Sequence, residues 1–404
     1  MYQMLKEKCD GLYERLVDLT GQLIRIPSPS LGEKQLAGRV RQAMIDIGYD
    51  PVITDEFGNV VGVIGGRAGA PAVLLNSHMD TLLSSDTNSE QIGRIEAGRL
   101  FGPGAADCKG GLAAQIMAGA LLKRSLLPLR GSLVVAATTT EENGLSVGVR
   151  GLLERTLPSM AIKPDYAILG EPTNLGLYYG HDGWMEMDVR VEGNNPFHVD
   201  DTARAIASRF GGTTDAEPGD NTGQTTSSYE PPKTENGLSR SLVRIDRRLA
   251  LAEDVDQVAR QVRREVAEVA GSVGTVAVAT TVRREHQKLY TGRTTMVRHV
   301  AHAWATDPFC PLMDRARQVL AAAGCPVRPG KWQLGRMGMG TAGGVLVNEF
   351  HVPTIGYGPG DETQAHCPGE SVELSHLSKA VYGTAALVHG LVGIPVYGWT
   401  SEEI

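Results

Sequence analysis

Several short apolar runs in this chain end on residues that can bind a metal ion, and this feature most restricts the fold. Residues 74–81 end on His78 and Asp80, an imidazole followed by a carboxylate that can orient it. Three more β-prone runs lead to similar groups: residues 133–137 to Glu141 and Glu142, 166–169 to Glu171, and 353–357 to Asp361, Glu362 and His366. Open α/β proteins build their sites where strand ends converge on one sheet edge. We therefore expect these side chains to meet there.

A further carboxylate, Asp107, lies in the glycine-rich residues 102–111, just before an apolar helical run. Two imidazoles with three carboxylates form a nitrogen and oxygen ligand set that suits two Zn²⁺ ions, with Co²⁺ or Mn²⁺ as alternatives. Each residue alone also has a structural explanation, such as a solvated turn for Glu141 and Glu142 or a helix start for Glu171. Cys108 and Cys367 flank two of the predicted ligands, so a thiol ligand is an alternative.

Composition sets the class of protein. The 404 residues exceed the length at which one core stops growing, so two domains are expected. A net charge of -7 without a Lys/Arg run argues against a nucleic-acid surface, and no apolar stretch approaches the ~18 residues of a membrane span. The charged N-terminus does not resemble a signal peptide. Five scattered cysteines without CxxC spacing favour free thiols in a reducing cytoplasm.

The spacing of apolar residues changes along the chain. Up to about Gly180, apolar runs alternate with helical stretches such as residues 35–47 and 112–123, the pattern of α/β layering with a mainly parallel sheet. Residues 184–192 and 242–249 instead alternate with period two, which indicates antiparallel strands with one wet face. We expect an inserted α+β domain at 183–305 and a discontinuous domain of 1–182 and 306–404. Residues 211–237, rich in Gly, Thr, Ser and Pro, are a predicted mobile loop.

Together these motifs resemble the M20 family of metallopeptidases and amidohydrolases, which includes carboxypeptidase G2, acetylornithine deacetylase, succinyl-diaminopimelate desuccinylase and aminoacylase. The resemblance covers nearly the whole chain, and the motifs have the family's order and spacing: His78-x-Asp80, Gly104-Ala105-Ala106-Asp107-x-Lys109-Gly110-Gly111, Glu141-Glu142, Gly170-Glu171-Pro172-Thr173 and His366. Residues 180–183, 283–287 and 358–366 look like the branch of YgeY-type hydrolases. The resemblance implies a zinc-peptidase-like catalytic domain with an inserted lid and dimerisation domain.

The resemblance also implies roles for the site residues. Asp107 would bridge two divalent metal ions, His78 and Glu171 would complete one site, and Glu142 and His366 the other. Asp80 would accept the second ring N–H of His78. Glu141 is interpreted as the general base that takes a proton from the attacking water and delivers it to the departing amine.

Residues of the inserted segment and one later loop are expected to contact substrate. In the family a lid histidine, here His198, often stabilises the oxyanion in a partner's site, which implies a homodimer through the inserted domain. Arg247 and Thr341 are predicted substrate contacts, and Arg336 is a candidate anion contact. Two positions depart from the family pattern: Phe197 replaces a small residue, and Ala342 replaces Asn or Asp.

These observations predict a metallohydrolase that cleaves an amide of an N-acyl amino acid, a short peptide or a related small molecule. A pathway-specific amidohydrolase is an alternative, with carrier-protein-linked amino acid release or aromatic amine deamination as its reaction. A catalytically inactive binding or scaffold protein on the same fold is the alternative outside enzymes.

Overall fold

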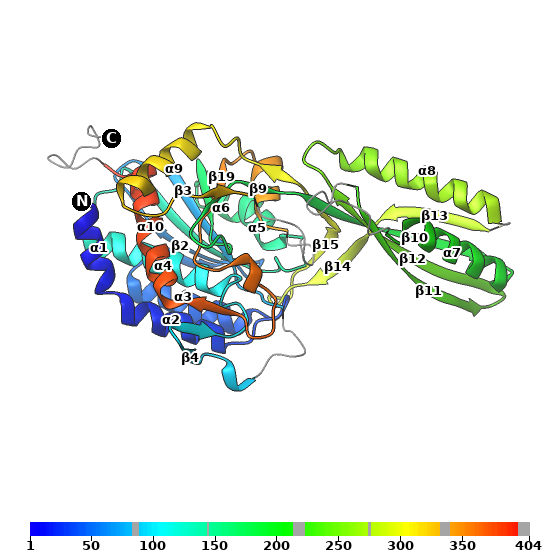
Figure 1. The fold of residues 1–404 in the computed structure, drawn as a ribbon, viewed down its shortest axis with the longest axis horizontal. Coiled ribbons are helices and arrows are strands. Elements are labelled where there is room, and N and C mark those ends of the chain that lie inside the picture. The colour runs from blue at the N-terminus through cyan, green and yellow to red at the C-terminus, as the bar shows by residue number, and fades with distance from the viewer. Residues whose placement is uncertain (83–88, 144, 213–222, 274–275, 332–339, 395–404) are drawn as a thin grey trace.

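The computed structural model describes residues 1–82, 89–143, 145–212, 223–273, 276–331 and 340–394. Its main sheet has eight strands in the order β1-β2-β6-β3-β7-β19-β8-β18 (Figure 1). The pairs β6–β3, β3–β7, β7–β19 and β8–β18 are parallel, which confirms the predicted α/β class with a mainly parallel sheet. The strands are β1 (Val52–Thr54), β2 (Val60–Ile64), β3 (Gly69–His78), β6 (Gly131–Thr138), β7 (Tyr166–Leu169), β8 (Leu177–Tyr178), β18 (Pro329–Gly330) and β19 (Thr354–Gly356).

Helical layers cover both faces of this sheet, because its central strands are apolar on both faces. On β6, Leu133 and Val135 point into one core, and Val134 and Ala136 into the other. The first core lies under α1 (Tyr2–Asp10), α2 (Tyr13–Arg25), α3 (Lys34–Ile47), α4 (Lys109–Ser125), α9 (Pro311–Ala322) and α10 (Leu374–Val392). The second lies under α5 (Val147–Gly151), the π-helical turns η2 (Leu152–Thr156) and η3 (Val345–Glu349), and α6 (Leu157–Ser159).

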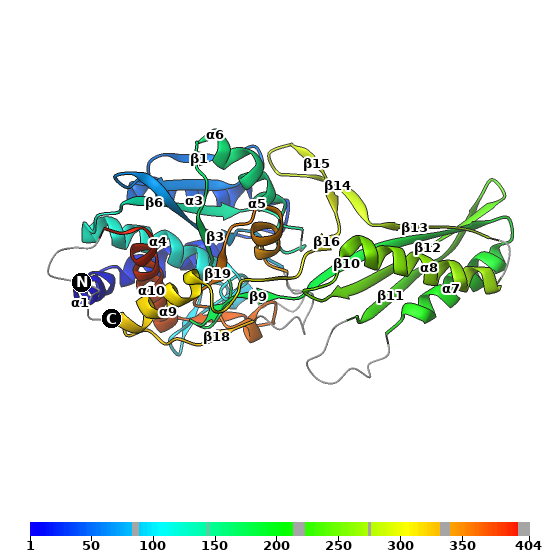
Figure 2. The ribbon, with the colours of Figure 1, turned by 90° about the horizontal axis from the view of Figure 1, so that it is seen from above.

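A second sheet extends away from the first, as Figures 1 and 2 show. Its strands are antiparallel and ordered β11-β12-β10-β13, with β16 also paired to β10: β10 (Gly183–Gly193), β11 (Thr225–Glu235), β12 (Leu238–Leu249), β13 (Ala277–Val282) and β16 (Val300–Ala301). Helices α7 (Pro196–Phe210) and α8 (Val255–Val273) pack on it and close a separate core. The period-two alternation of β10 and β12 is confirmed. This separate core supports our proposal that residues 183–305 form an inserted domain.

The predicted loop at 211–237 is only partly described. Residues 213–222 lie outside the described residues, but Thr225–Glu235 form strand β11, so the loop prediction is wrong for this part. The strand forms because β12 offers a free edge. Pro231 and Pro232 are tolerated there, since an edge strand needs fewer backbone donors and a bulge interrupts the pairing between Glu230 and Lys233.

A hairpin of β14 (Arg284–Lys288) and β15 (Thr294–Arg298) returns from the second sheet to the first layer (Figure 2). The hydroxyl of Tyr290 at its tip donates to the carbonyl of Gly58 at 2.7 Å. Leu289 and Val297 of the hairpin join one apolar cluster with Phe57, Leu145 and Val147.

The remaining elements are short. Strand β9 (Gly180–His181) pairs with β17 (Trp304–Ala305), and β4 (Ile95–Glu96), β5 (Arg99–Phe101) and β20 (Ser371–Glu373) form a three-stranded sheet, with single turns at η1 (Ser89–Gln91) and η4 (Glu362–Gln364). All five cysteines are free thiols, as predicted. Among the described residues, no helix is both long and apolar enough to span a membrane.

Candidate metal centre

The five predicted ligands lie together at one edge of the main sheet. His78 ends β3, and Glu142 and Glu171 follow its neighbours β6 and β7. Asp107 directly precedes Cys108, the residue before α4, and His366 follows β19 through the turn η4. The convergence of strand ends predicted from the sequence therefore holds for His78, Glu142, Glu171 and His366, and Asp107 joins them from the loop before α4.

The ligand atoms form two groups that share Asp107. In the first group, Nε2 of His78 lies 3.1 Å from Oδ1 of Asp107 and 3.7 Å from Oε2 of Glu171. In the second, Nε2 of His366 lies 2.8 Å from Oε2 of Glu142 and 3.5 Å from Oδ2 of Asp107. Each oxygen of Asp107 thus faces a different group, as a bridging carboxylate requires.

Close backbone packing fixes these segments, and two glycines make it sterically feasible. A Cβ at Gly111 on α4 would lie 1.8 Å from the carbonyl oxygen of Gly170, so only glycine lets α4 approach the segment that carries Glu171. Gly104 has φ of +83°, and a Cβ there would lie 2.6 Å from the side chain of Thr81. The glycine-rich sequence around Asp107 therefore has a steric cause.

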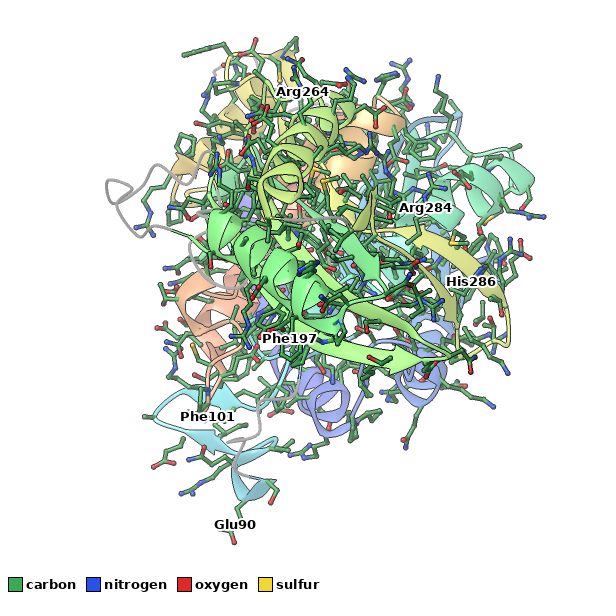
Figure 3. All side chains as sticks on the ribbon, turned by 90° about the vertical axis from the view of Figure 1, so that its right-hand side faces the viewer. Glu90, Phe101, Phe197, Arg264, Arg284 and His286 are labelled. Atoms are coloured by element: carbon green, nitrogen blue, oxygen red, sulfur yellow. The ribbon has the colours of Figure 1, made fainter. Side chains whose placement is uncertain are left out.

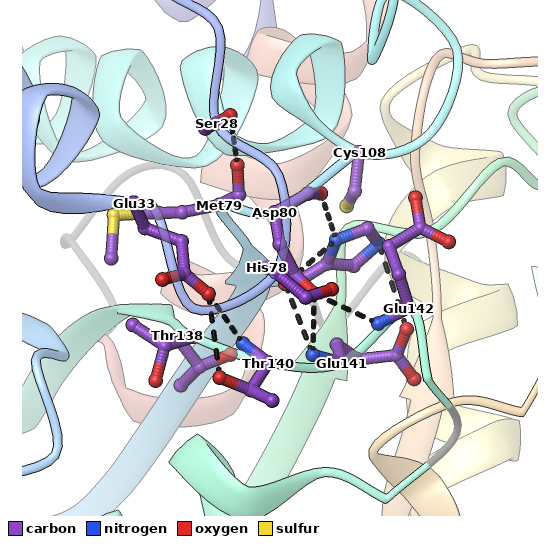
Figure 4. A network of polar contacts seen from close by, with 12 residues as sticks. Ser28, Glu33, His78, Met79, Asp80, Cys108, Thr138, Thr140, Glu141 and Glu142 are labelled. Carbon is purple, nitrogen blue, oxygen red and sulfur yellow. Dashed lines mark hydrogen bonds and ion pairs between the residues drawn. The ribbon is translucent and has the colours of Figure 1, made fainter. Parts of the chain in front are cut away.

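Asp80 is buried and fixes the neighbouring segment, as Figure 4 shows. Its carboxylate accepts hydrogen bonds from the backbone N–H of Glu141 at 2.9 Å and of Glu142 at 3.0 Å. Nδ1 of His78 contacts the carbonyl oxygen of Asp80 at 2.8 Å, whereas the nearest carboxylate oxygen is 3.7 Å away. The expected hydrogen bond to His78 is thus made by the backbone of Asp80 and not by its side chain.

Glu141 lies beside the two groups but belongs to neither. Its Oε2 is 3.9 Å from Nε2 of His78, and its buried Oε1 has no hydrogen-bond partner among the described residues. Burial raises the pKa of Glu141 well above its usual value, and the charges of Glu171, Glu142 and Asp80 act in the same direction. A buried carboxylate with a raised pKa binds a proton more readily than an exposed one, which suits a group that takes up a proton during catalysis.

The charge balance of the site fits bound cations. Several carboxylates are nearly inaccessible to solvent, and Oε1 of Glu171 and Nε2 of His366 have no hydrogen-bond partner among the described residues. The short contact between His366 and Glu142 thus lacks hydrogen-bond geometry, although it lies within ion-pair distance. Buried charges are costly unless they are paired or bind metal ions, so the donor set fits a pair of divalent cations.

Two buried carboxylates beside the site could not be singled out from the sequence. Glu33 accepts a hydrogen bond from the N–H of Thr140 at 3.0 Å, just before Glu141, as Figure 4 shows. Glu370 accepts hydrogen bonds from the loop that carries Asp107. Neither stands at the end of a predicted strand, and only their complete burial in the fold distinguishes them from surface glutamates.

The two cysteines beside the ligands differ. Sγ of Cys108 lies within reach of the first group, but its thiol donates to the carbonyl of Gly170 at 3.3 Å. Burial raises the pKa of Cys108 well above its usual value, which favours the neutral thiol. Cys367 belongs to neither group and contacts the carbonyl of Thr363 at 3.4 Å.

A cavity of about 470 Å³ adjoins Glu142 and reaches the second sheet, where both Arg247 and Arg248 line it. Arg247 is ion-paired with Glu253 at 2.7 Å. The side chain of Arg248 forms no hydrogen bond or ion pair within the described part of the chain. Burial lowers the pKa of Arg248, and the charges of Asp246 and Asp182 oppose this only in part. The sequence analysis predicted Arg247 as the substrate contact. In the described residues Arg248, and not Arg247, is the cavity arginine whose guanidinium has no ion-pair partner.

The remaining predicted residues do not join the metal groups. His198 is exposed near the start of α7, next to Phe197, which Figure 3 shows on the end of the second sheet that faces away from the first layer. The buried hydroxyl of Thr341 lies 3.0 Å from Nε2 of His181 and accepts from the indole N–H of Trp304. Thr341 does not line the cavity beside Glu142, and its substrate contact stays a prediction. Arg336 lies outside the described residues.

Paired ligand groups with a shared carboxylate, at the strand ends of an α/β sheet, define the class of metal-dependent hydrolases. Residues 74–389 match Peptidase family M20/M25/M40, and the chain belongs to this family of metallo-hydrolases that act on amide bonds.

Relatives match over nearly their whole length. The chain is 28% identical to a LysW-lysine hydrolase of Deinococcus radiodurans, over 93% of this chain and 97% of that protein. It is 25% identical to the uncharacterized protein YgeY of Escherichia coli, over 93% and 94%. The YxeP protein of Bacillus subtilis, described as a dinuclear metal-binding peptidase of the M20 family, shares the fold with a TM-score of 0.68 and 15% identity, over 95% of this chain and 99% of that one.

Proposed function

We propose that the protein uses two divalent metal ions, Zn²⁺ by preference, to hydrolyse an amide of an N-acyl amino acid, short peptide or related small molecule. The observation that carries this proposal is the sharing of Asp107 by two ligand groups, one oxygen to each. His78, Asp107 and Glu171 would hold one ion, and Asp107, Glu142 and His366 the other. Co²⁺ and Mn²⁺ suit the same donors. When bound, the ions supply Lewis-acid chemistry that acidifies water and polarises a carbonyl group.

Glu141 is the proposed general base. Its Oε1 is buried beside both groups and has no hydrogen-bond partner in the described part of the chain, so it can accept a proton from the attacking water. The same oxygen then delivers the proton to the departing amine. Asp80 supports this role because its carboxylate holds the backbone N–H groups of Glu141 and Glu142.

The cavity beside Glu142 is the proposed site for the amine portion of the substrate. Arg248 offers a guanidinium without a hydrogen-bond or ion-pair partner among the described residues, and Trp184 gives the same cavity an aromatic wall. A carboxylate on the leaving amino acid would complete the hydrogen bonds of Arg248. We therefore propose Arg248, in place of Arg247, as the contact for the substrate carboxylate.

His198 is proposed to act in the site of a partner subunit. It lies next to Phe197, which Figure 3 shows at the distant end of the second sheet, so it would reach a metal centre most directly across a dimer. The dimer and the oxyanion contact of His198 are both part of this proposal.

A second candidate function is release of an amino acid from a carrier protein. It is favoured by the full-length similarity to a relative named for hydrolysis of LysW-lysine. An inactive scaffold is disfavoured, because all five ligands and Glu141 are present and converge. Nothing among the described residues favours aromatic amine deamination.

Metal analysis followed by an activity panel tests the proposal. The metal-depleted protein is reloaded with Zn²⁺, Co²⁺ or Mn²⁺ and assayed for amine release from N-acyl amino acids, dipeptides and a carrier-linked lysine. We expect two ions per chain and cleavage of at least one class, with Glu141→Gln as the inactive control. A fully loaded protein that cleaves none of these amides would contradict the proposed function.

A further inference from the structure

Glu370 is a buried carboxylate beside the metal centre that belongs to neither ligand group. Its Oε1 accepts hydrogen bonds from the backbone N–H groups of Ala106 at 2.8 Å and Asp107 at 2.9 Å. Its Oε2 accepts one from the N–H of Gly104 at 3.0 Å. The loop that presents the shared ligand therefore wraps around one carboxylate.

The surrounding strands explain why Glu370 reaches this loop. Strand β20 starts at the next residue and pairs with β5, which leads into the loop. The N–H of Gly102 also donates to the carbonyl of Glu370 at 2.9 Å. Both the backbone and the side chain of Glu370 thus hold the loop through hydrogen bonds.

Glu370 also belongs to the segment that carries His366. Its own N–H donates to the carbonyl of Cys367 at 3.0 Å, which closes the turn directly after His366. Through these bonds it connects Asp107 and His366, two of the three ligands in the second group. Within the described part of the chain it forms no hydrogen bond or ion pair with His78 or Glu171, whose segments are fixed by β3, β7 and α4.

We propose that Glu370 is a positioning residue that sets the spacing between Asp107 and His366. It thereby determines the affinity of the ion held with Glu142, more than that of the ion held with His78. The inference rests on the proposed two-ion function and adds a residue to it. Side chains that support ligands in this way change metal affinity by about 10- to 100-fold when they are mutated.

Glu370→Gln is the first test. Glutamine keeps one oxygen for Ala106 and Asp107 but turns an NH₂ group toward the N–H of Gly104, which sets donor against donor. Metal-free protein is titrated with Co²⁺ and followed by calorimetry and by the visible absorption of the bound ion. We expect the first ion to bind as in the natural protein and the second about 10- to 100-fold more weakly, with an altered spectrum.

Asp165→Asn is the matched control. Oδ2 of Asp165 also accepts a backbone hydrogen bond, from Ala72 at 2.7 Å, but near the starts of β7 and β3, the ends opposite to those that lead to Glu171 and His78. This variant should lower thermal stability without changing either Co²⁺ affinity. Glu370→Asp keeps the charge on a shorter side chain and should weaken binding of the second ion less than Glu370→Gln. It replaces Glu370→Gln as the test if the glutamine variant does not fold.

The outcomes separate the two proposals. If the natural protein binds two ions and Glu370→Gln retains both affinities and the spectrum, the role of Glu370 is wrong while the two-ion site stands. Equal loss of affinity for both ions would also overturn the role of Glu370, because the effect would then be a general loss of structure. If the natural protein binds a single ion, the proposed function itself fails. The metal measurements do not depend on turnover or on the identity of the substrate.

Discussion

The candidate metal centre and the second sheet differ in how their charged side chains are held in place. Most of the proposed ligands follow strands that are buried on both faces, Asp107 precedes α4, and buried backbone contacts fix these segments. On the second sheet, arginines lie on the partly exposed face of antiparallel strands and pair with nearby acids, such as Arg247 with Glu253 and Arg244 with Asp188. Such pairs contribute only about 0–1 kcal/mol each and can exchange partners when a ligand arrives. The first region is therefore rigid before substrate binds, and the second is adaptable.

The largest expected effect tests the rigid region through its shared ligand. Asp107→Ala should lose both ions and nearly all activity, whereas His78→Ala should weaken chiefly one ion, because only Asp107 faces both groups. Metal content after dialysis measures this. Retention of two ions with natural affinity in Asp107→Ala would rule out the bridging role.

Glu141→Gln separates chemistry from metal binding in the same region. The change keeps the size of the side chain but removes the proton acceptor, so kcat should fall by about 10² to 10⁴. Metal content should stay the same, because Glu141 belongs to neither group. Loss of an ion in this variant would instead make Glu141 a ligand.

His198→Ala tests whether the second sheet contributes to chemistry in another subunit. Loss of one oxyanion donor should lower kcat by about 10² to 10³ without changing metal content. Mixing this variant with Glu141→Gln should restore some activity, since a mixed dimer contains one intact site. Inactive mixtures would argue against donation between subunits, and an unchanged kcat would remove the role altogether.

The two neighbouring arginines provide a direct test of adaptability. Arg248→Gln should raise KM by about 10- to 100-fold with little change in kcat, the effect of losing a charged hydrogen bond to substrate. Arg247→Gln should change KM little and cost about 1 kcal/mol of stability or less, because it breaks the pair with Glu253. Steady-state kinetics and thermal unfolding of both variants measure this, and reversed effects would restore Arg247 as the substrate contact.

The smallest expected effect is the change in metal affinity for each unit of pH. Burial opposes protonation of His366, but its close ion-pair contact with Glu142, together with the charges of Asp107 and Glu370, raises the pKa of His366 to about 9. Below that pH the metal-free imidazole carries a proton that the ion must displace. The affinity of the second ion should therefore rise about tenfold per pH unit up to pH 9 and then level off. Calorimetry in buffers of different ionisation enthalpy measures the released proton, and a flat affinity across this range would contradict the shift.

The same contrast explains what could be predicted from the sequence. Ligands such as His78 and Glu171 were predictable because their place at the end of an apolar strand determines their position in the sheet. Arg248 could not be distinguished from Arg247, since the difference depends on which of them meets Glu253.

Glu33 and Glu370 could not be predicted either, because their hydrogen bonds go to backbone groups distant in sequence. Strand β11 was missed for a related reason. A polar segment rich in Ser, Thr and Pro has no strand pattern of its own and becomes a strand because the edge of β12 is free.

The docked β14–β15 hairpin affects how the inserted segment could be exchanged or removed. Although residues 284–298 belong to that segment in sequence, the hairpin contributes Leu289 and Val297 to the buried apolar cluster with Phe57, and the hydroxyl of Tyr290 is bonded to Gly58. Excision of residues 183–305 would thus expose an apolar patch on the remaining layer and promote aggregation. An exchange of the inserted sheet between relatives would have to include both the hairpin and the residues around Phe57 and Gly58 that it contacts. The proposed boundaries at 183 and 305 therefore divide the chain in sequence but not in space.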